Sequence, residues 1–134
     1  MRILLDTNIA IWSVCDTQRI PNLILDQISD ENNEVFISTA SVWEVAIKNI
    51  SKPDKIPISE TDFINYCKQV NFDFLPIEIS HITNLRHLKA KCEEFVHKDP
   101  FDNIIVSQSV VEDMTLFTSD DLLSKYNYDK IVVV

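Results

Sequence analysis

The chain has 134 residues, 46% hydrophobic and 25% charged, a composition typical of a single globular domain over residues 1–134 and not of a disordered chain. Its net charge of −9 argues against an ordinary nucleic-acid-binding module, because such modules present basic surfaces to phosphates. The sequence contains no glycine, and this excludes the phosphate-binding loops of Walker-type and dinucleotide-binding proteins, which require it.

Apolar runs and helical spacings alternate along the chain, and they predict strands that alternate with helices. In chain order, we expect a strand at Arg2–Leu5, helices at Asn8–Cys15 and Pro21–Ile28, a strand at Val35–Ile37, a helix at Ser41–Ile50, a loop at Ser51–Ser59, a helix at Glu60–Val70, a strand at Phe72–Ile77, helices at His81–Phe95 and Phe101–Glu112, a strand at Met114–Phe117, a short helix at Asp121–Lys125 and a strand at Lys130–Val134. Pro76 interrupts the third strand, which is therefore expected at an edge of the sheet. This order predicts an α/β domain with a mainly parallel sheet and helices on both faces.

Two of the predicted strands end directly in a short polar segment that carries an aspartate. Asp6 follows the first strand, and Asp120 follows the strand at Met114–Phe117. In parallel sheets, functional sites form outside the carboxyl ends of the strands. Two carboxylates about 4 Å apart repel by roughly 4 kcal/mol at an effective dielectric constant near 20, so gathering them gains nothing unless a cation joins them. If the acids of this chain converge, the sequence therefore predicts a metal site.

Asp6 and Glu44 each have a simpler structural explanation. Asp6 can cap the helix that follows it, although the companion acids favour a metal-binding role. Glu44 lies within a predicted helix, one turn before Lys48, and the two can form an exposed ion pair. The alternative is that Glu44 points toward the strand ends, and the residue pattern leaves both interpretations open.

The segment from Asp99 to Asp102 has the pattern of a helix start. Asp99 suits the cap, and Pro100 suits the first helical position, which places Asp102 near a helix N-terminus where its charge is stabilised. We therefore expect Asp102 to face the metal. Of the adjacent Asp120 and Asp121, we expect Asp120 to be the metal ligand and Asp121 to cap the short helix.

Other polar residues provide weaker signals. Asn8 and Thr118 flank the acids, and together with Asp99 they are expected to orient a carboxylate or a water without binding the metal themselves. The histidines show no ligand spacing, and His97 is interpreted as a loop residue. The histidines of the chain are His81, His87 and His97, and its cysteines are Cys15, Cys67 and Cys92.

The cysteines and the start of the chain indicate the compartment. The three cysteines are widely spaced, which predicts reduced and mostly buried thiols. No apolar stretch approaches the roughly 20 residues that cross a bilayer, and Asp6 comes too early for a signal-peptide core. We therefore expect a cytoplasmic protein that does not associate with a membrane.

Four segments in order resemble the motifs of PIN-domain ribonucleases, and the size fits the VapC-type toxins of bacterial toxin–antitoxin pairs. They read Ile-Leu-Leu-Asp-Thr-Asn, Ser-Val-Trp-Glu-Val-Ala-Ile-Lys, His-Lys-Asp-Pro-Phe-Asp-Asn-Ile-Ile-Val-Ser-Gln-Ser and Leu-Phe-Thr-Ser-Asp. The resemblance covers essentially the whole chain and implies a three-layer α/β/α sandwich. Asp6, Glu44 and Asp102 match the family's three most characteristic acids, and Asp120 matches the fourth. Asp99 matches a position that is not generally counted among the metal ligands.

The chain departs from the family pattern at Asn103 and in the segment before His97, among other positions. Asn103 stands where many relatives carry arginine, so a basic contact to substrate near the site is missing. The segment Cys92–Val96 lacks the Leu-Pro element that usually precedes the residue at His97, which leaves the conformation of this loop open.

The expected activity is metal-dependent hydrolysis of RNA phosphodiester bonds by an endoribonuclease toxin. Carboxylates favour Mg²⁺ or Mn²⁺, and Asp6, Asp102 and Asp120 would face the ion while Glu44 binds it through a water or orients the attacking water. The resemblance implies an RNA substrate, a small antitoxin that covers the site and a second copy of the chain. Two alternatives remain: an aspartyl-phosphate (phosphoacceptor) domain and a non-catalytic PIN-like interaction domain.

Overall fold

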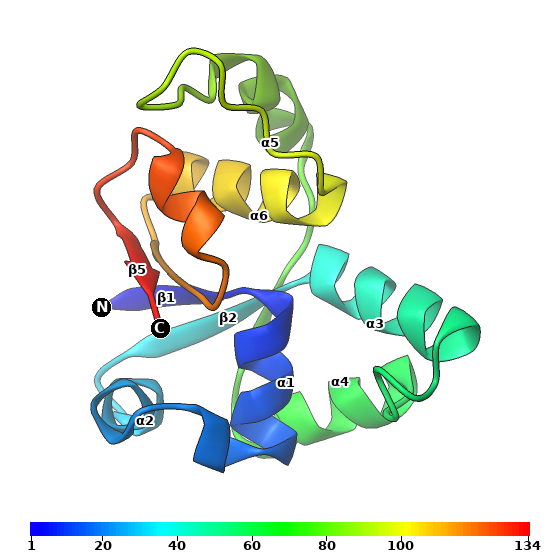
Figure 1. Ribbon diagram of the computed structural model, residues 1–134. Coiled ribbons are helices and arrows are strands. Elements are labelled where there is room, and N and C mark those ends of the chain that lie inside the picture. Colours follow the sequence, from blue (N-terminus) through cyan, green and yellow to red (C-terminus); the bar gives the residue numbers. More distant parts are fainter.

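The computed structural model describes residues 1–134 and contains a five-stranded sheet in the order β3-β2-β1-β4-β5 (Figure 1). All neighbouring strands are parallel. The strands are β1 (Arg2–Leu5), β2 (Glu34–Ser38), β3 (Asp73–Leu75), β4 (Thr115–Thr118) and β5 (Ile131–Val133). The predicted parallel sheet is confirmed, and so is the edge position of the strand that precedes Pro76.

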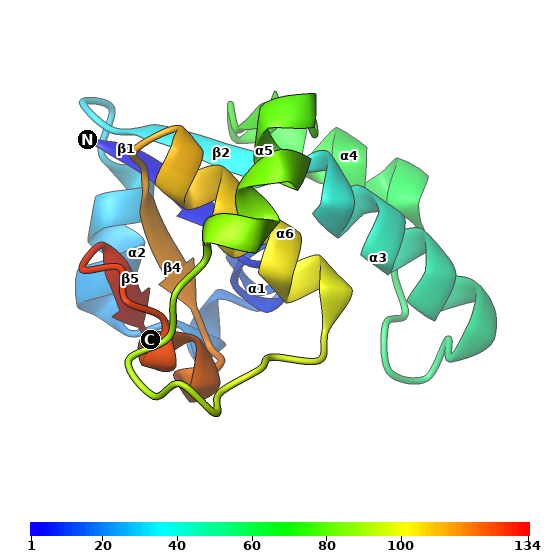
Figure 2. The ribbon, with the colours of Figure 1, turned by 90° about the horizontal axis from the view of Figure 1, so that it is seen from above.

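Helices cover both faces of the sheet, as expected for an α/β/α sandwich (Figures 1 and 2). The α-helices are α1 (Thr7–Cys15), α2 (Asn22–Ser29), α3 (Thr39–Ser51), α4 (Glu60–Gln69), α5 (Ile79–Thr83) and α6 (Pro100–Val111), and the 3₁₀ helices are η1 (Thr17–Arg19), η2 (Asn84–His87) and η3 (Asp121–Lys125). Helices α1, α2 and α4 lie on one face, and α5 and α6 lie on the other. None of the helices combines the length and apolar character that a bilayer crossing requires.

Strand β1 explains why its apolar run, Ile3-Leu4-Leu5, is continuous and does not alternate with polar residues. Successive side chains of a strand point to opposite faces of the sheet. Ile3 and Leu5 therefore pack into the cluster beneath α1, α2 and α4, whereas Leu4 packs into the cluster beneath α6. All three side chains are fully buried, as expected for a central parallel strand covered on both faces.

The connections at the carboxyl edge of the sheet are very short. A single residue, Asp6, separates β1 from α1, and β2 passes directly into α3 at Thr39. The chain leaves β4 through Ser119 and Asp120 before η3 begins. Three polar segments from distant parts of the sequence therefore start at the same edge of the sheet.

In the absence of glycine, two other residues adopt the left-handed backbone conformation that often ends a helix. Asn71 follows α4 with φ of 62°, and Asp113 follows α6 with φ of 54°. Both residue types tolerate this region better than most, because their short polar side chains can form local hydrogen bonds. Each residue then leads the chain into a strand of the sheet.

The prediction of one helix over residues 81–95 is wrong beyond His87. Residues 88–90 leave the helix and form an isolated antiparallel bridge between Ala90 and Tyr126, and residues 91–94 form a bend and a turn. The Lys91 amide donates to the Lys125 carbonyl at 2.7 Å, and the Asn127 amide donates to the Lys89 carbonyl at 2.7 Å. These tertiary hydrogen bonds outweigh the local preference of the segment for a helix.

The expectation of mostly buried thiols is also wrong, because only Cys67 is buried. Cys15 and Cys92 are exposed, and all three cysteines are free. Burial raises the pKa of Cys67 to about 12, with a smaller contribution from Cys15. Burial, followed by the charge of Asp16, also raises the pKa of Cys15.

We predict that iodoacetamide at pH 8 alkylates the native protein at Cys92 first and at Cys15 more slowly, and leaves Cys67 unmodified. The thiolate is the reactive form, and the pKa of Cys67 leaves little of it at that pH. Peptide mass spectrometry with and without urea measures the order. Alkylation of Cys67 in the folded protein at the rate of Cys92 would contradict the prediction.

Candidate metal centre

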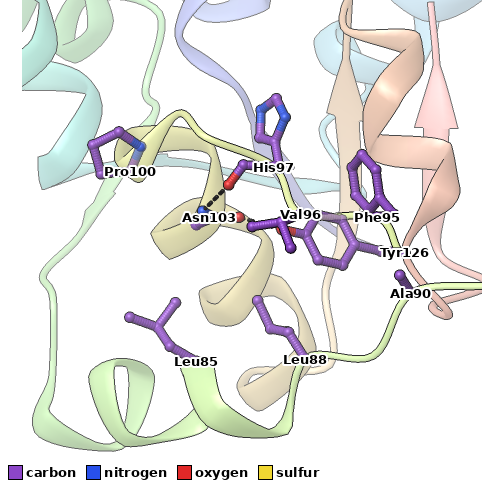
Figure 3. Close-up of a pocket in the computed structure, with 9 residues that line it drawn as sticks. All are labelled: Leu85, Leu88, Ala90, Phe95, Val96, His97, Pro100, Asn103 and Tyr126. Carbon is purple, nitrogen blue, oxygen red and sulfur yellow. Dashed lines mark hydrogen bonds between the residues drawn. The ribbon is translucent and has the colours of Figure 1, made fainter. Parts of the chain in front are cut away.

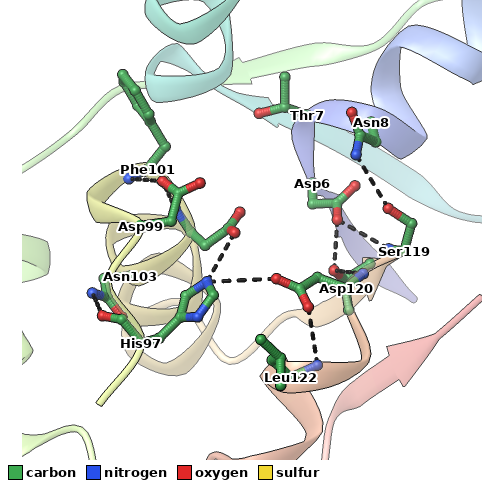
Figure 4. Close-up of polar contacts among 12 residues, drawn as sticks. Asp6, Thr7, Asn8, His97, Asp99, Phe101, Asn103, Ser119, Asp120 and Leu122 are labelled. Atoms are coloured by element: carbon green, nitrogen blue, oxygen red, sulfur yellow. Dashed lines mark hydrogen bonds and ion pairs between the residues drawn. The ribbon is translucent and has the colours of Figure 1, made fainter.

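A polar pocket of about 370 Å³ lies at the carboxyl edge of the sheet, and no hydrophobic residue lines it. It brings together all four acids that the sequence predicts for the site, together with Asp99. Figure 4 shows Asp6, Asp99 and Asp120 among the polar contacts of this region. The lining residues are Asp6, Thr7, Asn8, Glu44, Lys48, Asp99, Asp102, Ser119, Asp120 and Asp121. The convergence on which the metal hypothesis depends is therefore present.

Asp6 is the most firmly held of these acids, with 3% of its surface exposed. Its Oδ1 accepts a hydrogen bond from the Ile9 amide at 2.8 Å. Its Oδ2 accepts from the Thr118 hydroxyl at 2.5 Å and from the Ser119 amide at 3.0 Å. Burial raises the pKa of Asp6, and the charge of Glu44 adds to this, although the three hydrogen bonds oppose the change. The carboxylate is fixed, but its charge is not neutralised.

Helix capping and pocket lining are combined in the same aspartates. Asp6 caps α1, Asp99 caps α6 through the Phe101 amide at 2.9 Å, and Asp120 caps η3 through the Leu122 amide at 3.0 Å. In each case one oxygen, Oδ1, accepts the capping bond, and the residue still lines the pocket. The prediction that Asp121 caps the short helix is wrong, because the cap lies one residue earlier, where the chain is still extended.

Asp102 lies in the first turn of α6, as predicted, and its side chain is 17% exposed. Burial raises its pKa to about 6, and the charges of Asp99, Asp6 and Glu44 contribute in the same direction. The hydrogen bond with His97 lowers the pKa and only partly offsets these effects. Burial, together with the crowding of carboxylates, thus makes the charged form of Asp102 costly in the absence of a cation.

Glu44 pairs with Lys48, as one interpretation of the sequence expected, and it also points into the pocket, as the other expected. It forms the ion pair with Lys48 at 2.5 Å, but the pair faces the pocket, and the Glu44 side chain is only 6% exposed. The Thr7 hydroxyl donates to the other carboxylate oxygen at 2.5 Å. Burial lowers the pKa of Lys48, but the hydrogen bond and charge of Glu44, with the charges of Asp99 and Asp102, outweigh this and raise it. Lys48 is the only basic side chain that lines the pocket.

Thr118 and Asn8 have different surroundings, although both were expected to orient a carboxylate. Thr118 is buried and connects two acids, since its hydroxyl donates to Asp6 and accepts from the Asp120 amide at 3.0 Å. Asn8 is exposed and contacts the Ser119 hydroxyl at 3.4 Å, with no hydrogen bond to a carboxylate.

Sequence reasoning missed His97, which is more than a loop residue. Its Nε2 lies 3.0 Å from Asp102 Oδ2 and 3.5 Å from Asp120 Oδ2 (Figure 4). The side chain is 9% exposed. The available signal was its position shortly before a helix start that carries an acid in its first turn, because a residue at such a place can fold back over the helix N-terminus.

Asn103 holds the loop that carries His97. Its side-chain amide donates to the His97 carbonyl at 2.7 Å, and its oxygen accepts from the Tyr126 hydroxyl (Figure 3). An apolar cavity of about 330 Å³ lies beside this network, lined by Leu85, Leu88, Ala90, Phe95, Val96, His97, Pro100, Asn103 and Tyr126. The open question about the loop before His97 is thus resolved: Phe95 packs edge-on against Tyr126.

The residues of the pocket fit a divalent cation. Six acids and one lysine line it, and two of the acids, Asp6 and Asp102, have raised pKa values. Carboxylate oxygens are the ligands that Mg²⁺ and Mn²⁺ prefer. A bound cation would favour the charged form of both carboxylates and so oppose the effects of burial and of the neighbouring acids on their pKa values.

The fold and the pocket together define a class of α/β/α proteins with an acid-lined site at the carboxyl edge of a parallel sheet. Residues 3–127 match the PIN domain family, and the chain belongs to that family. The sequence matches none of the curated proteins.

Two solved structures share the fold. VapBC2 from Rickettsia felis, bound to a DNA fragment from its promoter, is similar with a TM-score of 0.72 and 15% identity over 100% of this chain and 98% of that chain. VapBC-1 from nontypeable Haemophilus influenzae has a TM-score of 0.61 and 16% identity over 90% of this chain and 87% of that chain. At these identities the likeness concerns the fold.

Proposed function

We propose that this chain is a metal-dependent endoribonuclease that hydrolyses RNA phosphodiester bonds, and that it is the toxin of a toxin–antitoxin pair. The convergence of Asp6, Glu44, Asp102 and Asp120 in one polar pocket is the observation that supports the activity most directly. Membership of the PIN family and the fold shared with the two VapBC structures support the toxin role.

Each lining residue has a role in this proposal. Asp6, Asp102 and Asp120 would hold Mg²⁺ or Mn²⁺, while Thr118 fixes Asp6 and Asp120 relative to each other. When bound, such a cation activates water as a nucleophile and offsets negative charge at the phosphodiester. Glu44 would orient the attacking water, because Thr7 and Lys48 hold its carboxylate in one place.

Lys48 would contact the phosphate and so replace the basic contact that Asn103 cannot make. We predict that Lys48→Gln lowers kcat/KM for RNA roughly tenfold, because a hydrogen bond to a charged group contributes about 1.5 kcal/mol. Steady-state cleavage of a fluorogenic RNA measures the effect. Lys52→Gln, at the exposed end of α3, is the matched control and should cleave at the wild-type rate. Equal rates for the wild type and Lys48→Gln would contradict this role.

The proposed partners are the RNA substrate, a small antitoxin and a second copy of the chain. The acid-lined pocket and the net charge of −9 favour an antitoxin that covers the site with a basic segment. The exposed Trp43, Ile47 and Ile50 follow one side of α3 and offer apolar area to the second copy.

An RNA cleavage assay with the purified protein, carried out with Mg²⁺, with Mn²⁺ or with a chelator, tests the proposed activity. Cleavage should require the cation, stop with the chelator and return when Mn²⁺ is added in excess. Cleavage that continues at full rate with the chelator would overturn the metal-dependent mechanism. Incubation with a small phosphodonor, followed by mass measurement, tests the phosphoacceptor alternative, for which a stable gain of one phosphoryl group is the signature.

A further inference from the structure

His97 has no role in the proposed activity so far, although it lies among the acids of the pocket. Its Nε2 and one oxygen each of Asp102 and Asp120 all lie within 4.8 Å of one another. A first-row cation binds nitrogen and oxygen ligands at about 2.1 Å, so two ligand atoms of one ion lie at most about 4.2 Å apart. The distances of 3.0 Å and 3.5 Å from His97 to the two aspartates fall inside this limit.

The position of the imidazole is fixed by its surroundings and not only by the acids. The ring of Phe95 stacks on it with an interplanar angle of 20° and a centroid distance of 6.2 Å. The backbone of His97 is held by the Asn103 amide, which Tyr126 holds in turn. A side chain that is 9% exposed and supported from two directions has the fixed geometry that a metal ligand needs.

We propose that His97 is a direct metal ligand and forms with Asp102 and Asp120 a His–Asp–Asp set that selects Mn²⁺ over Mg²⁺. This inference rests on the cation site of the proposed function and deepens it. Mg²⁺ is bound through oxygen ligands and water, whereas the divalent first-row transition ions, of which Mn²⁺ is the weakest binder, also bind sites that include nitrogen ligands. One nitrogen ligand therefore improves the binding of Mn²⁺ and contributes little to that of Mg²⁺.

Pulsed electron paramagnetic resonance of Mn²⁺ added to the full-length protein tests the inference without any activity. Electron spin echo envelope modulation detects a nitrogen that is bound directly to Mn²⁺. The wild type should show imidazole modulation, which changes when the histidines carry nitrogen-15. His97→Phe, which keeps an aromatic ring beside Phe95, should lose the modulation. His87→Gln removes an exposed histidine outside the pocket and should keep it.

Titration calorimetry gives a second readout on the same proteins. His97→Phe should bind Mn²⁺ more than about tenfold more weakly, while its Mg²⁺ affinity stays within about twofold of the wild type. His97→Gln serves if the phenylalanine variant does not fold, and the same loss of nitrogen modulation is expected.

The outcomes separate this inference from the proposed function. Mn²⁺ bound through oxygen alone, or nitrogen modulation that persists in His97→Phe, would overturn the role of His97 and leave the carboxylate site standing. Unchanged or stronger Mn²⁺ binding in His97→Phe would show that the imidazole occupies the position of the cation and does not bind it. This result would also overturn the role of His97 as a ligand. The absence of any Mn²⁺ binding would overturn both.

Discussion

Asp6→Asn is expected to reduce metal-dependent RNA cleavage more than about 100-fold. Mutation of a residue that contacts only the ligands of a metal ion typically lowers activity 10- to 100-fold, and mutation of a residue that binds the ion itself lowers it more. Asp6 is almost fully buried and held by three hydrogen bonds, so no neighbouring side chain can move into its place. The variant removes the charge but keeps the size and the helix cap, because asparagine caps helices as well as aspartate does.

The measurement is single-turnover cleavage with saturating Mn²⁺, with urea unfolding as a check of the fold. The side-chain NH₂ group of the asparagine would face the backbone N–H of Ser119, so that two donors meet. This loss of a hydrogen bond costs about 1 kcal/mol and leaves the protein folded. Asp26→Asn neutralises an exposed acid on α2 and is the matched control for net charge. A cleavage rate within a few-fold of the wild type would exclude Asp6 from the chemistry.

Asp102→Asn is expected to stabilise the metal-free protein and to weaken the stabilisation that Mn²⁺ provides. In the metal-free protein the substitution removes a charge from a crowded pocket, so the free energy of unfolding at pH 7 should rise by about 1 to 2 kcal/mol. An asparagine oxygen can still accept the hydrogen bond that His97 offers. Mn²⁺ at 100 times its Kd should stabilise the wild type by about 2.7 kcal/mol and the variant far less.

The pH dependence of the metal-free protein provides a separate measurement on the same variant. Folding raises the pKa of Asp102 from 3.8 to about 6, so the folded chain holds this proton more tightly than the unfolded chain. The contribution of Asp102 to stability is therefore greatest at low pH, and it is lost as the pH rises from about 4 to about 6. Urea unfolding of Asp102→Asn should lack this loss, whereas Asp26→Asn should keep it. Parallel pH profiles for the wild type and Asp102→Asn would contradict the assignment.

The sheet and the meeting place of the acids could be predicted because both follow from local patterns. The short, continuous apolar run Ile3-Leu4-Leu5 is consistent with a buried strand, and parallel strands place the residues after their carboxyl ends at one edge. The start of α6 was equally clear, because Asp99 and Pro100 are the residue types that favour a cap and a first turn.

Other features depend on contacts between distant segments, which one sequence does not display. The direction of Glu44 was open until Thr7, 37 positions away, was found to hold it. The end of the helical segment at His87 depends on backbone hydrogen bonds of Lys89 and Lys91 with Asn127 and Lys125. His97 reaches Asp102 and Asp120 because Asn103 and Tyr126 position its backbone, and no spacing rule relates these residues.

The aspartates that cap helices while lining the pocket have a consequence for genetic screens. If the proposed toxicity is selected against, an alanine at Asp6, Asp99 or Asp120 removes a helix cap and a pocket carboxylate in a single step. The cap alone is worth about 1 kcal/mol, so such survivors combine a weaker fold with altered chemistry. Comparing the asparagine and alanine variants at each position separates the two losses, and the asparagine variants report on the chemistry.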